Sequence, residues 1–70
     1  MKPFHFTTGT DTVLLGRYER LNDGRLRVKL AHSKSVLIGV LDSQDDTWTF
    51  TLSKDSPSFP GSVFVGQFNP

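Results

Sequence analysis

Most of the chain alternates apolar and polar residues with a period of two, and this pattern constrains its fold more than any other feature. Residues 47–52 are the clearest example, with Trp48, Phe50 and Leu52 in one set and three threonines in the other. Residues 25–30 repeat the pattern with cations in place of the threonines. Because successive side chains of a β-strand point to opposite faces, the alternation predicts half-buried strands. The chain is therefore expected to be all-β, with one face of each strand left for water or a partner.

Turn-forming residues divide the alternating pattern into six short strands, and no stretch of ten residues has a helical period. The predicted strands are residues 4–8, 12–21, 25–31, 35–41, 47–53 and 62–68. Six strands in 70 residues predict a single domain, residues 1–70, folded as a small six-stranded antiparallel barrel or sandwich. In size and strand count, this domain would be SH3-like or OB-like.

Three segments add detail to this prediction. Gly16 lies inside the second predicted strand, where a glycine indicates a bend or the close approach of another backbone. Residues 35–41 are almost continuously apolar, which predicts a strand covered on both faces. Residues 42–46 are all turn formers and are expected to form a loop.

The segment 22–24, with the sequence Asn-Asp-Gly, predicts a tight hairpin turn. A two-residue turn would pair residue 22 with Arg25, whereas a three-residue turn with a left-handed glycine would pair Leu21 with Arg25. We favour the three-residue turn because it gathers the apolar residues of both strands on one face. It also places Glu19 opposite Arg27, which is a favourable pair across two strands.

No combination of residues in the sequence indicates catalysis or a metal centre. The chain has no cysteine, so disulfides and cysteine-based zinc sites are excluded. The two histidines, His5 and His32, are not spaced as metal ligands and would need a carboxylate partner such as Asp42 or Asp45. These aspartates and Asp46 lack the long run of oxygen ligands found in a calcium-binding loop. We therefore expect a protein that is not an enzyme and that uses no metal or cofactor.

The chain carries no signal for a membrane. Its longest apolar run has six residues, 36–41, against the roughly 20 needed to span a bilayer. Its N-terminal residues do not resemble a signal peptide. Together with the missing cysteines, these features favour a cytoplasmic location.

Charge is distributed unevenly although the net charge is only +1. Residues 17–34 contain six cations against two acids, and residues 42–55 contain four aspartates against one lysine. Closely spaced cations on a strand resemble a phosphate-binding surface, so one hypothesis is a nucleic-acid-binding barrel that uses the hairpin 17–34. Tyr18, the one aromatic residue of this hairpin, is predicted to face inward, and base stacking would need it outside. The candidate contacts are Arg17, Arg20, Arg25, Arg27 and Lys29.

The last predicted strand carries no charge and has apolar residues on both faces. Val63 and Val65 alternate with Phe64 and Phe68. An exposed edge strand is normally protected by charge, proline or a bulge. The strand therefore either closes the barrel, buried on both sides, or pairs with another chain. The four residues form the candidate protein interface.

The leading functional hypothesis is a non-enzymatic protein-interaction module, which could be an accessory, inhibitory or self-assembling subunit. Its partner would be another protein or further copies of itself, and small stand-alone β-proteins of this kind include phage-encoded factors. Nucleic-acid binding is the alternative. A third hypothesis is a ligand or glycan site on Trp48, but its alternation with threonines favours Trp48 as a core residue.

Overall fold

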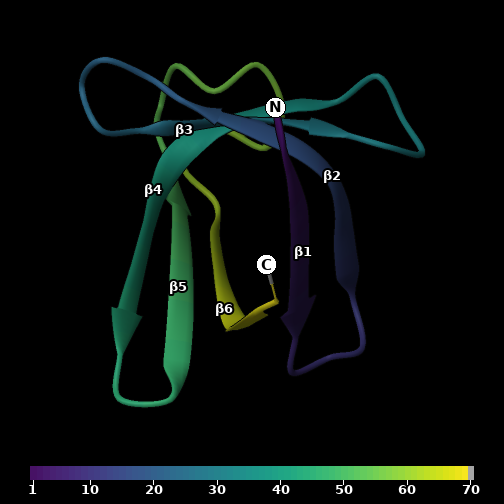
Figure 1. The fold of residues 1–70 in the computed structure, drawn as a ribbon, viewed down its shortest axis with the longest axis vertical. Coiled ribbons are helices and arrows are strands. Elements are labelled where there is room, and N and C mark those ends of the chain that lie inside the picture. The colour runs from purple at the N-terminus through teal and green to yellow at the C-terminus, as the bar shows by residue number, and fades with distance from the viewer. Residues whose placement is uncertain (70) are drawn as a thin grey trace.

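The computed structural model describes residues 1–69, which form six antiparallel strands without a helix. The strands are β1 (Lys2–Thr8), β2 (Val13–Arg20), β3 (Leu26–Leu30), β4 (Val36–Gln44), β5 (Thr47–Leu52) and β6 (Val63–Phe68). Each strand pairs with the next along the chain, and β6 pairs with β1, so the sheet closes into a barrel (Figure 1). The all-β prediction and the six-stranded antiparallel barrel are confirmed. Five strands agree with their predicted bounds to within two residues.

The barrel has a crossing layer at one end. In Figure 1 the second half of β2, β3 and the first half of β4 lie across the top, while β1, β5 and the rest of β4 stand roughly vertical below them. In the same view β2 and β4 each bend between their two halves, and each of these strands contains a glycine, Gly16 or Gly39. A Cβ atom at Gly16 would overlap the backbone of Lys29, and one at Gly39 would overlap the backbone of Thr51. The close approach predicted for Gly16 is confirmed.

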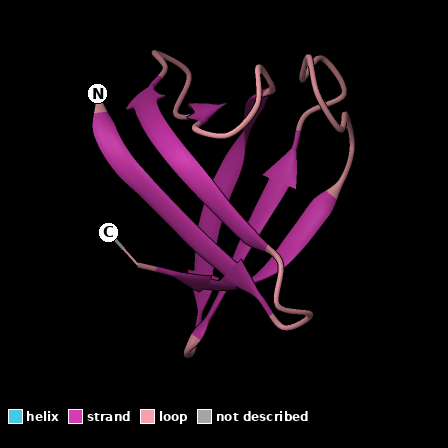
Figure 2. Cartoon of the chain, turned by 90° about the vertical axis from the view of Figure 1, so that its right-hand side faces the viewer, coloured by secondary structure: helices cyan, strands magenta, loops and turns pink. Residues whose placement is uncertain are grey.

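The interior of the barrel is filled by one apolar cluster. The rings of Phe4 and Phe6 both pack near Phe50, with centroids 5.4 and 6.5 Å from its own. Figure 2 shows the strands inclined to one another around this interior, with connecting loops at both ends. Burial of large aromatic rings supplies much of the stability of so small a domain. The buried hydrophobic residues are Phe4, Phe6, Leu14, Leu26, Val28, Leu37, Phe50 and Leu52.

The β2–β3 hairpin has the predicted three-residue turn. The N–H of Leu21 donates to the Arg25 carbonyl oxygen at 2.8 Å. Gly24 has a φ of 89°, in the left-handed region that glycine adopts without strain. Glu19 lies opposite Arg27, as expected. The register that gathers the apolar residues on one face is therefore the one observed, and it sets the face on which every side chain of the hairpin lies.

The prediction of a loop at residues 42–46 is wrong, because most of this segment belongs to a strand. β4 continues to Gln44, which pairs with Thr47, and only Asp45 and Asp46 form the turn. Asp45 has a φ of 56°, a conformation that Asp tolerates better than most residues. Pairing with β5 has overridden the turn preference of this segment. Side-chain propensity alone does not predict such pairing.

The strand expected to be covered on both faces is covered only at its start. The loop 53–62 lies along this part of β4, where Ser58 N–H donates to the Val36 carbonyl oxygen at 3.0 Å. The Ile38 N–H donates to Ser56 Oγ at 3.1 Å. Further along β4, Val40 is half exposed, so the prediction of burial on both faces is wrong there.

Candidate binding surfaces

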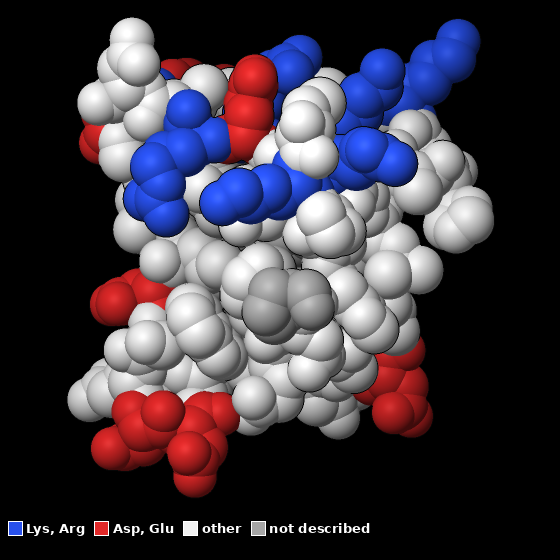
Figure 3. All heavy atoms as spheres, in the orientation of Figure 1, with Lys and Arg blue, Asp and Glu red and all other residues white. Residues whose placement is uncertain are grey.

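The charged side chains lie at two opposite ends of the barrel. All eight Lys and Arg residues lie on the start of β1, the crossing layer and its flanking loops, together with three acids, a net charge of +5. Figure 3 shows the blue side chains across the upper part of the molecule and red ones at its lower rim. We call these regions the basic end and the acidic end. The acidic end carries four aspartates: Asp11, Asp42, Asp45 and Asp46.

Two of the five candidate nucleic-acid contacts are engaged in ion pairs. Arg25 Nη1 lies 2.9 Å from Asp55 Oδ1, and Arg25 Nε lies 2.7 Å from Asp23 Oδ2. Arg27 Nη1 lies 3.6 Å from Glu19 Oε1. Arg25 therefore joins the β2–β3 turn to the loop 53–62. Both arginines are partly neutralised, and Arg25 has a structural role that the sequence pattern did not reveal.

These contacts also change the proton affinities of the groups involved. The pKa of the Asp23 carboxyl is lowered because it accepts hydrogen bonds from the Arg25 backbone N–H and from the Arg25 guanidinium. The pKa of Arg25 is raised by its hydrogen bonds to Asp55 and then to Asp23. Both shifts favour the charged forms of Asp23 and Arg25.

The other three candidates have no ion pair among residues 1–69. Arg17 lies directly opposite Lys29 in the β2–β3 register, and Arg20 is exposed near the end of β2. Tyr18 faces inward as predicted, with its ring against Phe4. The structure therefore separates the five cations into a free set of three, Arg17, Arg20 and Lys29, and a paired set of two.

The strand β6 closes the barrel, and its four predicted interface residues divide between two faces. Phe64 and Phe68 point inward and pack against the core, and the Phe68 ring centroid is 5.5 Å from that of Trp48. Val63 and Val65 point outward and are 55% and 52% exposed. The expectation that a closing strand would be buried on both sides is therefore wrong. Only Val63 and Val65 are available to a partner.

Pairing leaves part of β6 with a strand on one side only. In the described residues, β1 pairs with β6 over 6–8 and 66–68, whereas 63–66 pair with β5. The unpaired edge of Val63–Val65 borders a groove of about 510 Å³ whose other wall is the β1–β2 connection at Thr8–Thr12. No charged side chain lines this groove. We call it the β6 groove.

The outer face beside the β6 groove is also free of cations. Thr51 lies between Val40 and Val63 across β4, β5 and β6, and Thr49 lies opposite Val65. Val40 and Val63 are both about half exposed. This array of β-branched side chains adjoins the groove through Val63 and Val65.

Trp48 points toward the interior with Phe50 and Leu52, as predicted, but it lies at the margin of the core. It is half-buried and packs edge-on against Phe68. A small cavity of about 150 Å³ lies beside it and also contacts Tyr18 and Leu41. The indole ring is therefore directed into the barrel, whereas a glycan platform needs its face outside.

No group of three or more His, Asp or Glu side chains within residues 1–69 is arranged to hold a metal ion. His5 and His32 are exposed and lie on β1 and in the β3–β4 turn. The one buried polar residue in this part of the chain is Ser56, whose hydroxyl donates to the Ser58 carbonyl oxygen at 2.7 Å. No helix in the described residues could cross a bilayer.

A second groove lies over β1, β2 and β3, and sequence reasoning missed it. Its apolar lining comes from three strands, so no local sequence motif predicts it.

Comparisons with protein-family models, curated protein sequences and solved structures find no match to this chain.

Proposed function

We propose that the protein is a non-enzymatic interaction module that pairs through the β6 groove with a second copy of itself. The observation that carries this proposal is the half-exposed, uncharged edge of Val63–Val65, which has a strand partner on one side only. Backbone groups at such an edge are free to receive another strand, a common mode of protein recognition.

The chemistry of the edge favours a second copy as the partner. In a two-fold contact the same residues meet from both sides, so a charged edge would repel itself. Val63 and Val65 and the threonines beside them bring no like charges together. Two antiparallel β6 edges would also bury exposed valine side chains in a domain whose own core is small.

Sedimentation at increasing protein concentration tests this proposal. The wild-type protein is expected to associate, and Val65→Lys is expected to give a folded monomer because it places a charge in the contact. Val13→Lys is the matched control, since Val13 is also an outward-facing strand valine and is 46% exposed. A wild-type protein that stays monomeric, or a Val13→Lys protein that dissociates equally, contradicts the proposal.

A second candidate function is nucleic-acid binding at the basic end, and the segregation of charge supports it. The eight cations lie together, while the four aspartates that could repel a phosphate backbone lie at the far end. The contacts would come from the free set of Arg17, Arg20 and Lys29. Because Tyr18 is inside the barrel, binding would rely on phosphate contacts and not on base stacking.

The salt dependence of oligonucleotide affinity tests this second candidate function. If oligonucleotide binding occurs, the log of the binding constant should fall with the log of the salt concentration. Replacing the free set with Gln should make this slope less steep by about 0.9 for each duplex phosphate contact that is lost. Replacing the paired set, Arg25 and Arg27, should change the slope less, because these arginines already face acids. Absence of binding to any oligonucleotide at low salt removes this candidate.

A further inference from the structure

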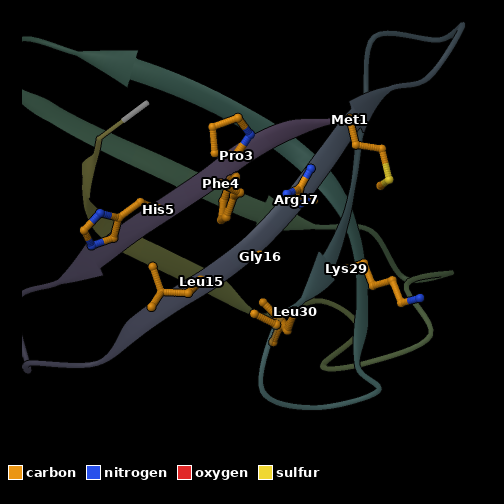
Figure 4. Close-up of a pocket in the computed structure, with 10 residues that line it drawn as sticks. Met1, Pro3, Phe4, His5, Leu15, Gly16, Arg17, Lys29 and Leu30 are labelled. Atoms are coloured by element: carbon orange, nitrogen blue, oxygen red, sulfur yellow. The ribbon is translucent and has the colours of Figure 1, made fainter.

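The second groove combines an apolar floor with two cations. It has a volume of about 560 Å³, within the range of roughly 300–1,000 Å³ that is usual for small-ligand sites. Met1 and Leu15 line it and are 59% and 39% exposed. Figure 4 shows that its side chains come from β1, β2 and the end of β3. We call it the β1–β3 groove. Its apolar lining includes Met1, Pro3, Leu15, Leu30 and Ala31.

Small residues make this floor accessible. Gly16 on β2 has no side chain, and Ala31, which directly follows β3, contributes only a methyl group. The groove therefore reaches down to Phe4 and Leu30, which belong to the core or pack against it. Exposed apolar surface of this kind on a small protein is characteristic of a contact site.

The charge of the groove is entirely positive. Arg17 and Lys29 are register partners on β2 and β3, and both line the groove. Neither has an ion pair among residues 1–69, and no Asp or Glu lines the groove. Two neighbouring cations without a counter-charge are suited to a carboxylate, which accepts charge-assisted hydrogen bonds from both.

We propose that the β1–β3 groove binds a free single-chain amphiphilic carboxylate of the fatty-acid type. The carboxylate contacts Arg17 and Lys29, and the hydrocarbon chain covers Leu15 and Ala31. A neutral apolar ligand would leave the cation pair unused. The residues that line this site are separate from those that line the β6 groove, so the proposal does not depend on the proposed self-association.

Titration of isotope-labelled protein with decanoate, below the concentration at which decanoate self-associates, tests the proposal by NMR. Saturable shifts are expected at the amides of Leu15, Gly16 and Ala31, and decanol should bind more weakly than decanoate. Octanoate should bind more weakly as well, by up to about fourfold for each methylene group that is no longer buried. Equal binding of decanol and decanoate, or shifts confined to other strands, overturns the proposal.

Matched variants test the two halves of the site. Ala31→Glu should abolish decanoate binding by repulsion, whereas the isosteric Ala31→Gln should retain more of it. Arg17→Gln should weaken binding about tenfold, and Arg25→Gln, outside the groove, should not. The dispersion of each spectrum verifies that the variant is folded. Equal affinity of Ala31→Glu and Ala31→Gln, or an unchanged affinity in folded Arg17→Gln, contradicts the assignment.

Discussion

Arg25 Nη1 lies 2.9 Å from Oδ1 of Asp55, a residue thirty positions further along the chain. This ion pair fastens the loop after β5 to the turn between β2 and β3. The same loop covers the start of β4 through hydrogen bonds from Ser58 and to Ser56. Arg25 is therefore part of the framework of the basic end, and its replacement should affect stability before it affects binding.

Breaking this pair should lower the melting temperature. We expect Arg25→Gln to be more destabilising than Asp55→Asn, because Arg25 also pairs with Asp23. The stability that the double variant loses should be smaller than the sum of the losses in the two single variants, since both substitutions remove the same interaction. Lys54→Gln is the control, because Lys54 makes no ion pair in the described part of the chain. Additive losses in thermal denaturation would show that Arg25 and Asp55 are not coupled.

The acid side of the stability profile should depend on Asp23. Its pKa lies below the ordinary value of 3.8 in the folded protein, so its contribution is present above that pH and is lost as the pH falls through the folded pKa. Asp23→Asn should therefore lower the melting temperature more at neutral pH than at acidic pH, where the wild-type Asp23 loses its charge as the pH falls through its folded pKa. Melting curves across this range measure the difference. A loss that is equal at both pH values would show that charge is not responsible.

Gly16→Ala should destabilise the barrel, because the added Cβ would overlap the Lys29 backbone on the paired strand β3. Forcing an extra methyl group into a packed site costs about 1–3 kcal/mol, and here the neighbour is backbone, which yields less easily than a side chain. Gly9→Ala is the matched control, since no atom beyond the two neighbouring residues lies within 4 Å of the position that a Cβ would take there. Chemical denaturation of the two variants gives the comparison. Equal stability would mean that the bend relaxes without cost.

The two large aromatic side chains of β5 should differ in their contributions. Phe50 is fully buried, and Phe50→Ala should cost about 3–5 kcal/mol. Trp48 is only half-buried, so Trp48→Ala should cost less despite the larger side chain removed. A soluble quencher should therefore reduce part of the Trp48 fluorescence of the native protein. A larger loss for Trp48 would place it nearer the centre of the core than the structure does.

The local chemistry of the sequence was sufficient to predict most of the fold. The period of two predicted the strands, and the sorting of apolar residues onto one face predicted the register of the β2–β3 hairpin. The same reasoning failed at residues 42–44, where pairing with β5 overrides the preference for a turn. Burial along β4 also depended on the loop 53–62, whose return to that strand has no local signal.

The candidate sites were predicted less completely because they depend on contacts between distant segments. The alternation within β6 separated Val63 and Val65 from the two phenylalanines, but it could not show where pairing with β1 ends. The cation pattern could not show that Arg25 reaches Asp55. The β1–β3 groove joins residues of three strands and appears only once the barrel is closed.

The central claim is that the unpaired edge of β6 receives a second copy, and amide hydrogen exchange at single residues tests it. Ser62 directs its carbonyl toward β5, so by alternation the N–H of Phe64 also faces β5 and that of Val65 faces away. We predict that the Val65 amide exchanges rapidly in dilute protein and slowly in concentrated protein, while the Phe64 amide is protected in both. Rapid exchange at Val65 in a sample that has demonstrably associated would contradict the claim, because the contact would then lie elsewhere.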